Sequence, residues 1–555
     1  MNLVHYRRNI VLFVLLLSAS AFSQTWNWAS QVATFSTGGF GANRTKAIAV
    51  DANENIYAIG EYGDSALIGG VKVKAFGSGA ELFLAKYNSA GTPAWVKSWG
   101  STGFLDQAID VTTDAAGDVY MCGSFFGQGL FDGDSIAPTT ATVGLVKCNS
   151  DGVLQWSKIV RNETSGPGGI TFANNRVYVA IGRTFAIYEP DGDSIMTITI
   201  PTSPSYFVQY RDVTVDVGGR ICVVGQFKGT ITFGTNTLSS SSVNDPDILV
   251  VKYEPDGNVI WAKRAGAVST PGQEDIAQAV TTNELGDVYV VGQYVGKAFF
   301  DTDSVMTGAA IQGFFTVKYD SEGNFQWVKG SSGTTGCTAN AYGVKMLANE
   351  DVLVSAGFSI RITVADTTYN LAGGSDVLML RLSPDGVRRW GKRSDTFATA
   401  CVNGDLALNA SKNAAYTGGQ FFSAITFGPT SMTIGSGVTD GWLAKMTINT
   451  FTDVKELAGT PLPQSFSLSQ NYPNPFNPTT TIDFKIASAS NVNISVINVL
   501  GQRVRNLVDQ NLTVGNYSTT WDGRDEYNQP VSSGIYFYRL QSGSYIETHK
   551  MTLLK

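Results

Sequence analysis

Carboxylates are the side chains on which any catalytic chemistry in the main part of this sequence would have to depend. The 555 residues include two histidines, His5 and His549, so residues 24–450 contain none. A Ser-His-Asp triad, a Cys-His pair or a His-ligated metal is therefore excluded from that part of the chain. A pair of carboxylates acting as acid and base needs no histidine and remains open.

Acidic residues recur at one position of a repeat, six residues before a repeated tyrosine position. Four units carry an acid at this position: Glu81, Asp247, Asp376 and Asp440. Two other units have Thr142 or Gly313 there. A ring of such carboxylates could bind a cation or act as acid and base. The alternative, which we favour, is that each one accepts backbone N–H groups where a strand begins.

Two Asp-x-Asp pairs offer oxygen ligands that calcium would accept. The pairs are Asp132 with Asp134 and Asp301 with Asp303. Each lies between two apolar residues spaced five apart, but a full calcium loop is absent. We favour plain turn formation and keep these four residues as weak candidates for a calcium site.

Five cysteines occur, an odd number without any CxxC spacing, so the chain is not a disulfide scaffold. A Cys122–Cys148 bridge between neighbouring strands is one possibility, and the states of Cys337 and Cys401 stay open. Cys148 and Cys222 take the place of repeated tyrosines, so we predict that both are buried and inert.

The N-terminus has the pattern of a secretory signal peptide. A basic pair precedes the apolar run Ile10–Leu17, and small residues follow. Eight residues at 1.5 Å each cannot span about 30 Å of hydrocarbon, which argues against a membrane anchor. We expect residues 1–23 to be removed, leaving Gln24 or Phe22 as the mature N-terminus.

The composition suits short strands joined by turns. Charged residues make up 15%, aromatics 11%, and glycine accounts for 60 positions. The net charge of −7 argues against nucleic-acid binding, which would call for a basic surface. Cations or neutral glycans are more natural partners for such a chain.

The middle of the chain is a repeat of seven units, each about sixty residues long. One position per unit is held by Tyr57, Tyr120, Tyr178, Cys222, Tyr289, Leu353 and Tyr416. A second strict position holds tryptophan: Trp95, Trp156, Trp261, Trp327 and Trp390. The third unit is shortened and has Met196 there. At this fixed spacing we interpret the tryptophans as core and not as glycan platforms.

Each unit contains two hairpin signals, which gives four antiparallel strands, a to d. Four-stranded units in series predict a seven-bladed β-propeller. The first strands are rich in Ala and Gly, as strands crowding a central axis should be. The seventh unit lacks its fourth strand, and Trp26–Ala29 provides a suitable one. The longer b–c and d–a connections share one end of such a fold, so any binding face should lie there.

The repeated pieces resemble the bacterial β-propeller repeat called SBBP. The pieces are D-x-x-G-[DN]-V-Y-V-x-G and K-Y-x-x-x-G-x-x-x-W, and the resemblance covers roughly residues 26–450. It is fairly specific for the fold and carries no information about a ligand.

The C-terminal part forms a separate small domain. Residues 451–464 read as a linker with two prolines, and alternating strands with a central tryptophan across 465–555 predict a small antiparallel, immunoglobulin-like sandwich. This domain also resembles the type A sorting domain of the type IX secretion system of Bacteroidetes. The resemblance implies passage across the outer membrane, removal of the domain, and release or lipopolysaccharide anchoring. The sorting pattern corresponds to Gly501, Gly515, Trp521, Gly534, Tyr536 and Lys550.

The sequence therefore predicts an all-β exported protein handled by the type IX machinery, with no further segment long enough to span a membrane. We expect a non-enzymatic cell-surface or secreted protein that binds a glycan or a surface protein. The alternative is a carboxylate-dependent polysaccharide hydrolase or lyase, which three or more acids beside an open cleft would favour.

Overall fold

The structure is a computed structural model, and its described part begins at Gln24 and ends at Leu554. The gaps within it are 35–42, 64, 76–78, 102–105, 128, 132–133, 136–141, 162–165, 243, 268–273, 349, 396–400, 436–438, 449–454, 458–462, 526–529 and 544. The predicted signal peptide, residues 1–23, lies outside the described residues. Where the chain is described, it contains no helix of the length and apolarity needed to cross a membrane.

Seven sheets of the described chain share one plan, in which four antiparallel strands follow one another as hairpins. The first holds β2 (Arg44–Val50), β3 (Ile56–Gly63), β6 (Ala80–Tyr87) and β7 (Pro93–Ser101). The second holds β8 (Gln107–Thr113), β9 (Val119–Phe125), β12 (Thr142–Cys148) and β13 (Leu154–Arg161). The third holds β14 (Gly168–Ala173), β15 (Arg176–Ile181), β16 (Thr184–Tyr188) and β17 (Ser194–Thr199). The fourth holds β18 (Tyr206–Val215), β19 (Ile221–Phe233), β21 (Asp247–Tyr253) and β22 (Val259–Ala267).

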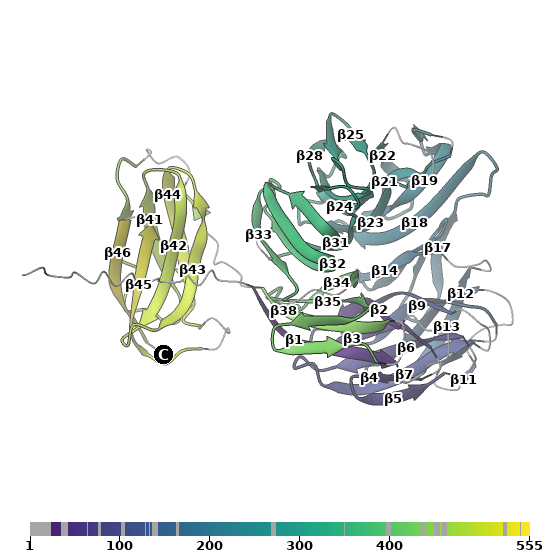
Figure 1. Cartoon of the computed structure of the whole chain (residues 1–555), viewed down its shortest axis with the longest axis horizontal. Helices are drawn as coiled ribbons and strands as arrows, with labels where there is room; N and C mark the ends of the chain where they lie inside the picture. The colour runs from purple at the N-terminus through teal and green to yellow at the C-terminus, as the bar shows by residue number, and fades with distance from the viewer. Residues whose placement is uncertain are drawn as a thin grey trace, which may run out of the picture.

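The remaining three sheets follow the same order. The fifth holds β23 (Ile276–Thr282), β24 (Val288–Tyr294), β27 (Gly313–Tyr319) and β28 (Phe325–Gly330). The sixth holds β30 (Ala339–Met346), β31 (Val352–Val364), β32 (Thr367–Leu382) and β33 (Arg388–Arg393). The seventh holds β34 (Cys401–Leu408), β35 (Ala414–Phe421), β38 (Asp440–Thr447) and β1 (Thr25–Thr34). Figure 1 shows these sheets arranged around a common centre.

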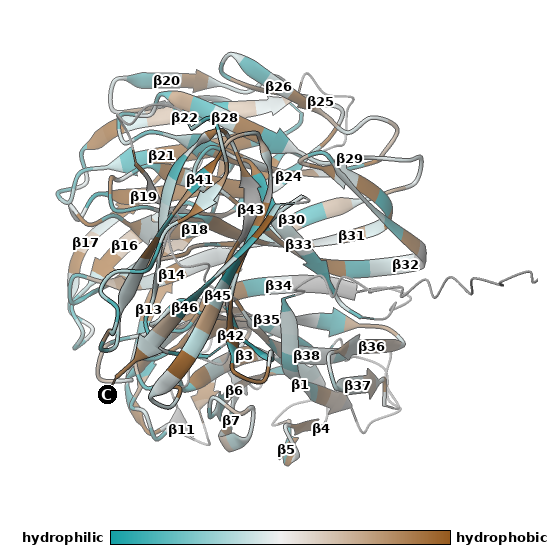
Figure 2. Cartoon of the chain, turned by 90° about the vertical axis from the view of Figure 1, so that its left-hand side faces the viewer, coloured by the Kyte–Doolittle hydropathy of each residue, from teal (hydrophilic) through white to brown (hydrophobic). Residues whose placement is uncertain are grey.

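The first strand of each sheet lies innermost and contacts the first strand of the next sheet. The contacts run from β2 to β8, β14, β18, β23, β30 and β34, and β34 contacts β2 again. Hydrophobic clusters fill the space between consecutive sheets. One packs Leu82 against Met121, and another packs Tyr416 and Leu443 of the seventh sheet against Ile56 of the first. The core is thus divided among the gaps between neighbouring sheets. Figure 2 shows hydrophobic residues distributed over strands of many sheets and not gathered in one of them.

The N-terminal segment completes the seventh sheet, as the sequence predicted. β1 pairs antiparallel with β38, with Thr25 opposite Thr447 and Val32 opposite Gly441. Trp26 is 1% exposed there. Since β38 would otherwise be an open edge, this pairing covers the backbone groups that an unpaired strand would present.

Short hairpins in the b–c connections extend the sheet that precedes them. β4 (Ser65–Ile68) pairs with β1, β10 (Gly129–Phe131) with β7, and β25 (Lys297–Phe300) with β22. Their second strands are β5 (Val71–Lys74), β11 (Asp134–Ser135) and β26 (Asp303–Met306). Further short strands are β20 (Asn236–Ser239), β29 (Ser332–Gly333), β36 (Ala424–Phe427) and β37 (Thr430–Thr433). Consecutive sheets are therefore tied together by backbone hydrogen bonds as well as by packing.

The C-terminal part consists of two four-stranded sheets around one core. The first is ordered β39 (Lys455–Glu456), β44 (Gly515–Trp521), β41 (Thr480–Ile486), β40 (Ser467–Leu468). The second is ordered β43 (Arg503–Leu512), β42 (Ser490–Asn498), β45 (Gly534–Ser542), β46 (Tyr545–Leu553). β39 falls in the predicted linker 451–464, and the Leu457 N–H donates to the Asn516 carbonyl at 2.8 Å. The sandwich therefore begins earlier in the chain than the predicted boundary at 465.

The cysteines are thiols at the four positions whose side chains are described. Cys122 and Cys148 face different gaps: Cys122 packs into the cluster with Ile170, and Cys148 into the cluster with Leu82. The suggested Cys122–Cys148 bridge is therefore wrong, because the two side chains lie on opposite faces of one sheet. Cys148 and Cys222 are both 0% exposed, and burial raises the pKa of each thiol to about 12. The side chain of Cys401 lies outside the described residues.

Candidate functional site

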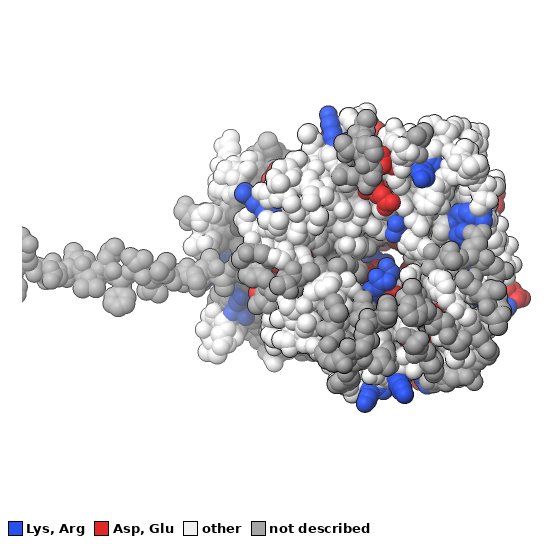
Figure 3. Space-filling view, turned by 45° about the vertical axis from the view of Figure 1, so that its right-hand side comes forward, with Lys and Arg blue, Asp and Glu red and all other residues white. Residues whose placement is uncertain are grey.

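The inner strands enclose a channel with a cavity of about 570 Å³. All seven inner strands contribute to its wall. Small residues let these strands approach closely: a Cβ on Gly169 would lie 2.4 Å from the Asp212 carboxylate. Figure 3 shows basic and acidic side chains gathered around a hollow in the middle of one face. The channel is a concave feature lined by all seven inner strands and is therefore our candidate site.

Six inner strands carry a β-bulge. β34 carries Gly404 and Asp405 at its bulge, and in the other five a single extra residue lines the cavity. These residues, which we call the bulge ring, are Lys46, Ile109, Arg211, Gln278 and Tyr342. A bulged residue has no partner opposite it in the ladder, which allows its side chain to be redirected. The bulges fall near the start of each inner strand, at the end of the channel where the d–a connections lie.

Three aspartates lie at or next to the bulges and connect neighbouring inner strands. Asp110 accepts the Ile170 N–H at 2.8 Å, and Asp212 accepts the Val280 N–H at 2.9 Å. Asp405 accepts the Ile48 N–H at 3.3 Å, which links the seventh sheet to the first. Each carboxylate also accepts the N–H of its own following residue. These hydrogen bonds give the three acids a structural role at the axis.

The same aspartates are electrostatically perturbed. Burial raises the pKa of Asp212 to about 6. Burial, together with the carboxylates of Asp405 and Asp212, raises the pKa of Asp110 well above its usual range. Lys345 faces all three: burial lowers its pKa, but the nearby carboxylates raise it more, so the net shift is upward. The channel therefore contains a mixed group of charges in which carboxylates and ammonium groups influence one another.

The acids predicted at the start of strand c are buried and bonded to backbone. Asp247 is 1% exposed and accepts the Ser241 N–H at 2.6 Å, and Asp440 is 0% exposed and accepts the Gly435 N–H at 2.8 Å. Asp376 accepts the Val377 N–H at 2.7 Å, and Glu81 is also buried. Asp247 and Asp440 therefore hold the backbone of two separate loops, and the structure does not bring the four acids together in one open cleft.

Only one of the two Asp-x-Asp pairs has both side chains among the described residues. Asp301 and Asp303 are exposed around a turn, and Asp301 forms an ion pair of 3.4 Å with Lys263. Asp132 lies outside the described residues, as does the side chain of Asp134. No group of three or more His, Cys, Asp or Glu side chains that could hold a metal occurs in the described part of the chain.

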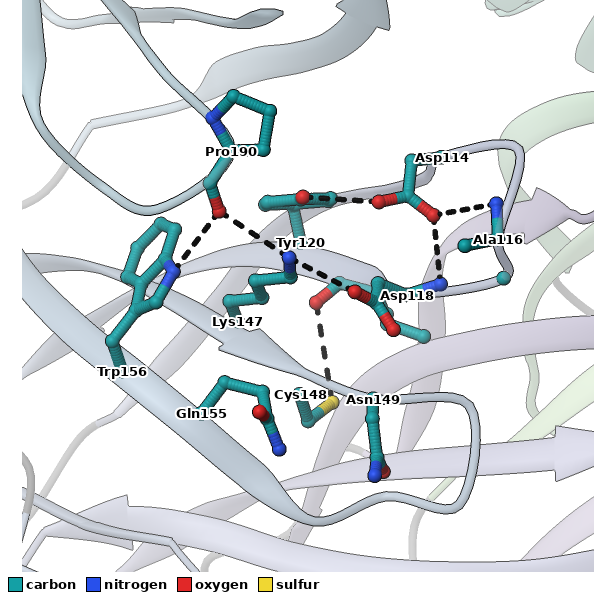
Figure 4. A network of polar contacts seen from close by, with 12 residues as sticks. Asp114, Ala116, Asp118, Tyr120, Lys147, Cys148, Asn149, Gln155, Trp156 and Pro190 are labelled. Atoms are coloured by element: carbon teal, nitrogen blue, oxygen red, sulfur yellow. Dashed lines mark hydrogen bonds and ion pairs between the residues drawn. The ribbon is translucent and has the colours of Figure 1, made fainter. Parts of the chain in front are cut away.

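The repeated Tyr, Lys and Trp positions form a network between neighbouring sheets, shown for one junction in Figure 4. Lys147 pairs with Asp118 at 2.9 Å and lies over the Tyr120 ring. Its Nζ and the Trp156 Nε1 both donate to the Pro190 carbonyl in the next sheet, at 3.3 and 3.1 Å. Trp261 and Trp327 donate in the same way to the Ser321 and Pro384 carbonyls, so these tryptophans also link neighbouring sheets. Trp261 is buried, and the other repeated tryptophans are half-buried.

The shortened third unit leaves a second cavity, of about 300 Å³, beside the channel. Arg161, Arg183, Tyr206, Phe207 and Gln209 are among the residues lining it. Its b–c connection is reduced to a tight turn at Gly182, whose φ of 56° suits glycine. Deleting a loop from one unit therefore creates a notch in the end of the molecule where the other units carry long connections.

The residues of the sorting pattern lie in the C-terminal sandwich. Trp521 is 0% exposed, and its Nε1 donates to the Arg524 carbonyl at 2.8 Å. The Tyr536 hydroxyl donates to the Ser532 carbonyl at 2.8 Å, and the Lys550 carbonyl accepts from Gln470 at 2.9 Å. Gly501 has a φ of 76° in a turn. Gly515 begins β44, where a Cβ would lie 3.0 Å from the Tyr517 ring, and Gly534 begins β45 with open space around it.

The channel charges were missed from the sequence, although a signal was present. Asp110 and Asp212 each stand ten residues before the repeated tyrosine position, where other units have Ala47, Ala279 or Gly343. Most other units have small residues at this position of the innermost strand, with Leu406 of the seventh unit as the exception, so a charged residue there indicates a side chain near the axis. The bulges themselves have no such signal, because the pairing register is a property of two strands.

Comparison with known proteins assigns the C-terminal part. Residues 470–553 match the family of secretion system C-terminal sorting domains, which confirms the predicted sorting domain. The chain is also similar to an uncharacterized WD repeat-containing protein of Acanthamoeba polyphaga mimivirus, 23% identical over 333 residues. That match covers 51% of this chain and 22% of the relative, so it spans about a fifth of the relative's length.

Two solved structures are among the structural neighbours. The WD40 domain of Neurospora crassa Pan2 is 9% identical with a TM-score of 0.38, and the match covers 74% of this chain and 90% of that one. PorZ of Porphyromonas gingivalis, described as an essential surface component of the type IX secretion system, is 10% identical with a TM-score of 0.25. That match covers 96% of this chain and 87% of PorZ. Propeller-like proteins are thus found among the neighbours of this all-β chain.

Proposed function

We propose that this chain is a seven-bladed β-propeller of the SBBP type with an immunoglobulin-like sorting sandwich, exported as a non-enzymatic binding protein. The C-terminal sorting domain indicates a secreted or cell-surface protein. Ring closure is supported by the cyclic contacts of the inner strands and by the pairing of β1 with β38. The sorting domain would be removed once it has directed export, leaving the propeller as the working part.

The channel is the observation that supports a binding role. A cavity of about 570 Å³ is within the size range of small-molecule sites, and its wall carries hydroxyl, amide and charged groups. The ligand would reach it from the end formed by the b–c and d–a connections, which vary most in length between units. A glycan or the tip of a surface protein fits this geometry.

The buried acids argue against the hydrolase or lyase alternative. A glycosidase needs two carboxyl groups on either side of an open substrate cleft. Asp247 and Asp440 are instead bonded to loop backbone, and Asp110 and Asp212 bridge neighbouring inner strands. Acids committed to backbone N–H groups are poorly placed to exchange protons with a substrate.

A glycan array probed with the mature exported protein tests the proposal. We expect saturable binding to a restricted set of glycans, without release of reducing ends from any of them. Turnover of a polysaccharide that is lost in Asp247→Asn or Asp376→Asn, but retained in Asp303→Asn at an exposed turn, would replace the binding role with the enzymatic one.

A further inference from the structure

We propose that the bulge ring holds the anionic oxyacid group of a small ligand, a carboxylate, sulfate or phosphate, between Lys46 and Arg211. This inference rests on the proposed function, because it assigns a ligand class to the channel described there.

The two cations approach the cavity from different sides of the ring. Lys46 belongs to β2 in the first sheet and Arg211 to β18 in the fourth, and both are the extra residue of a bulge. Within the described residues, neither side chain forms a hydrogen bond or an ion pair, and the buried Arg211 Nε has no acceptor. A guanidinium and an ammonium group therefore face a common cavity without a direct ion pair among the described residues. The carboxylates of Glu61 and Asp110 act on Lys46, and that of Glu274 acts on Arg211, only at longer range.

The nearby acids are already engaged. Arg44, a further cation lining the channel, forms an ion pair with Glu61, and its Nη2 donates to Glu61 at 3.0 Å. Asp110 and Asp212 each accept two backbone N–H groups. Burial lowers the pKa of Lys46; the charges of Arg44 and Arg211 add to this shift, and those of Glu61 and Asp110 oppose it. Burial lowers the pKa of Arg211 to about 10, against the opposing charge of Glu274. Both cations are thus held in a place that disfavours their charge, and an anion between them would relieve that cost.

The remaining members of the ring suit a small polar molecule attached to the anionic group. Gln278 offers an amide and Tyr342 a hydroxyl, while Ile109 adds an apolar surface. A guanidinium binds planar carboxylate and tetrahedral oxyacid groups through two parallel N–H bonds, which fixes their orientation. The net charge of −7 disfavours anions at the outer surface. Selective entry of one anionic group into the channel therefore depends on this local pair of cations.

Titration calorimetry on the mature exported protein provides the test. The probes are galacturonate, galactose 6-sulfate and galactose 6-phosphate, with galactose as the neutral match. The channel variants are Lys46→Met, which removes the charge at nearly constant length, and Arg211→Gln, which replaces the guanidinium with a shorter neutral amide. Lys74→Met on an exposed hairpin strand and Arg183→Gln at the second cavity serve as matched controls.

We expect at least one anionic probe to bind the unmodified protein and to bind about tenfold or more weakly to each channel variant. Binding should leave Lys74→Met and Arg183→Gln unaffected and should exceed binding of galactose. The relative affinities of the three anionic probes then distinguish a carboxylate source from a sulfate or phosphate source. The proposal is overturned if no anionic probe binds at concentrations up to about 10 mM. Loss of binding in Arg183→Gln alone would overturn it too.

A second readout does not depend on choosing the right ligand. Because an anion bound to the folded state stabilises it, sulfate should raise the melting temperature more in the unmodified protein than in Arg211→Gln at equal ionic strength. An equal shift in both proteins would contradict the site. A neutral glycan whose affinity is unchanged in both channel variants would overturn the anion site while leaving the binding function in place. Glycan turnover would contradict the proposed non-enzymatic function. The anion site would then still be judged by the calorimetry and the melting-temperature shift.

Discussion

Trp28 and Ser89, 61 residues apart in the sequence, are joined by a hydrogen bond of 3.2 Å from the indole Nε1 to the main-chain carbonyl. Lys445 Nζ donates to the same carbonyl at 3.0 Å. The pair repeats the arrangement of Lys147 and Trp156 at the Pro190 carbonyl. The N-terminal strand thus supplies the missing tryptophan of the seventh unit and places it against the first.

Replacing Trp28 should weaken the ring at this junction. Trp28→Phe keeps a ring against the Gly91 turn but loses the indole hydrogen bond, so we expect the free energy of unfolding to fall by about 1 kcal/mol. Trp28→Ala also removes the packing and should cost about 2 to 4 kcal/mol. Urea denaturation of the mature protein measures both values. Val153→Ala, at an exposed turn position, should change stability by less than about 0.5 kcal/mol; equal losses in all three variants would contradict the closure role.

Deleting residues 24–34 should have a larger effect than any single substitution. The deletion exposes the edge of β38 and opens the cluster that contains Trp26 and Phe427. We expect aggregation or loss of a cooperative transition, because an unpaired strand edge can pair with another chain. A synthetic peptide of residues 24–34 added in trans should restore the transition, and the same peptide with Trp28→Ala should restore it less well. A soluble, equally stable deletion variant would show that β1 is dispensable.

A buried acid should make stability depend on pH. Asp275 accepts the N–H groups of Ala267 and Val295 at 2.5 and 2.9 Å, and burial raises its pKa to about 7. Asp247 adds to the upward shift and Arg264 opposes it. Between about pH 4 and pH 7 the folded state keeps a proton that the unfolded chain has released. The contribution of this group to the free energy of unfolding therefore falls as pH rises through that window and is constant above it.

The measurement compares Asp275→Asn with the unmodified protein at pH 5 and pH 8. The amide does not titrate, so the stability of the unmodified protein relative to the variant should be greater at pH 5, by about 2 to 4 kcal/mol. Asp303→Asn at an exposed position should show no such difference between the two pH values. The absence of a difference between the two pH values would mean that Asp275 is ionised in the folded state at pH 5 and would contradict the raised pKa.

The sequence predicts the repeat well because its signals are local. Pro-Asp-Gly turns, alternating strands and the tryptophan spacing are set within about twenty residues, and the hairpins followed from them. Even the non-local pairing of Trp26–Ala29 could be inferred, since a unit lacking one strand leaves an edge to be covered. The charges of the channel could not be placed in the same way. Whether Lys46 and Arg211 face the same cavity depends on bulges and on the curvature of seven sheets together.

The C-terminal domain should direct export on its own, and its boundary can be tested. β39 pairs Lys455 with Ser518 at the edge of β44, so the sandwich needs residues before 465 for a complete sheet. We expect a fusion of 451–555 to a secreted reporter to reach the cell surface in a host with the type IX system. A fusion of 465–555 should be exported less efficiently, because it leaves the β44 edge uncovered.

The reciprocal experiment removes residues 451–555 from the full chain. The N-terminal repeat region has its own hydrophobic clusters between sheets and should stay folded, but without the sorting domain it should remain in the periplasm. Surface labelling of whole cells against a periplasmic marker separates these outcomes. If the truncated protein still reaches the surface, the export signal lies elsewhere in the chain. For the fusion experiment described above, equal export of 451–555 and 465–555 would show that β39 is not needed for recognition by the export machinery.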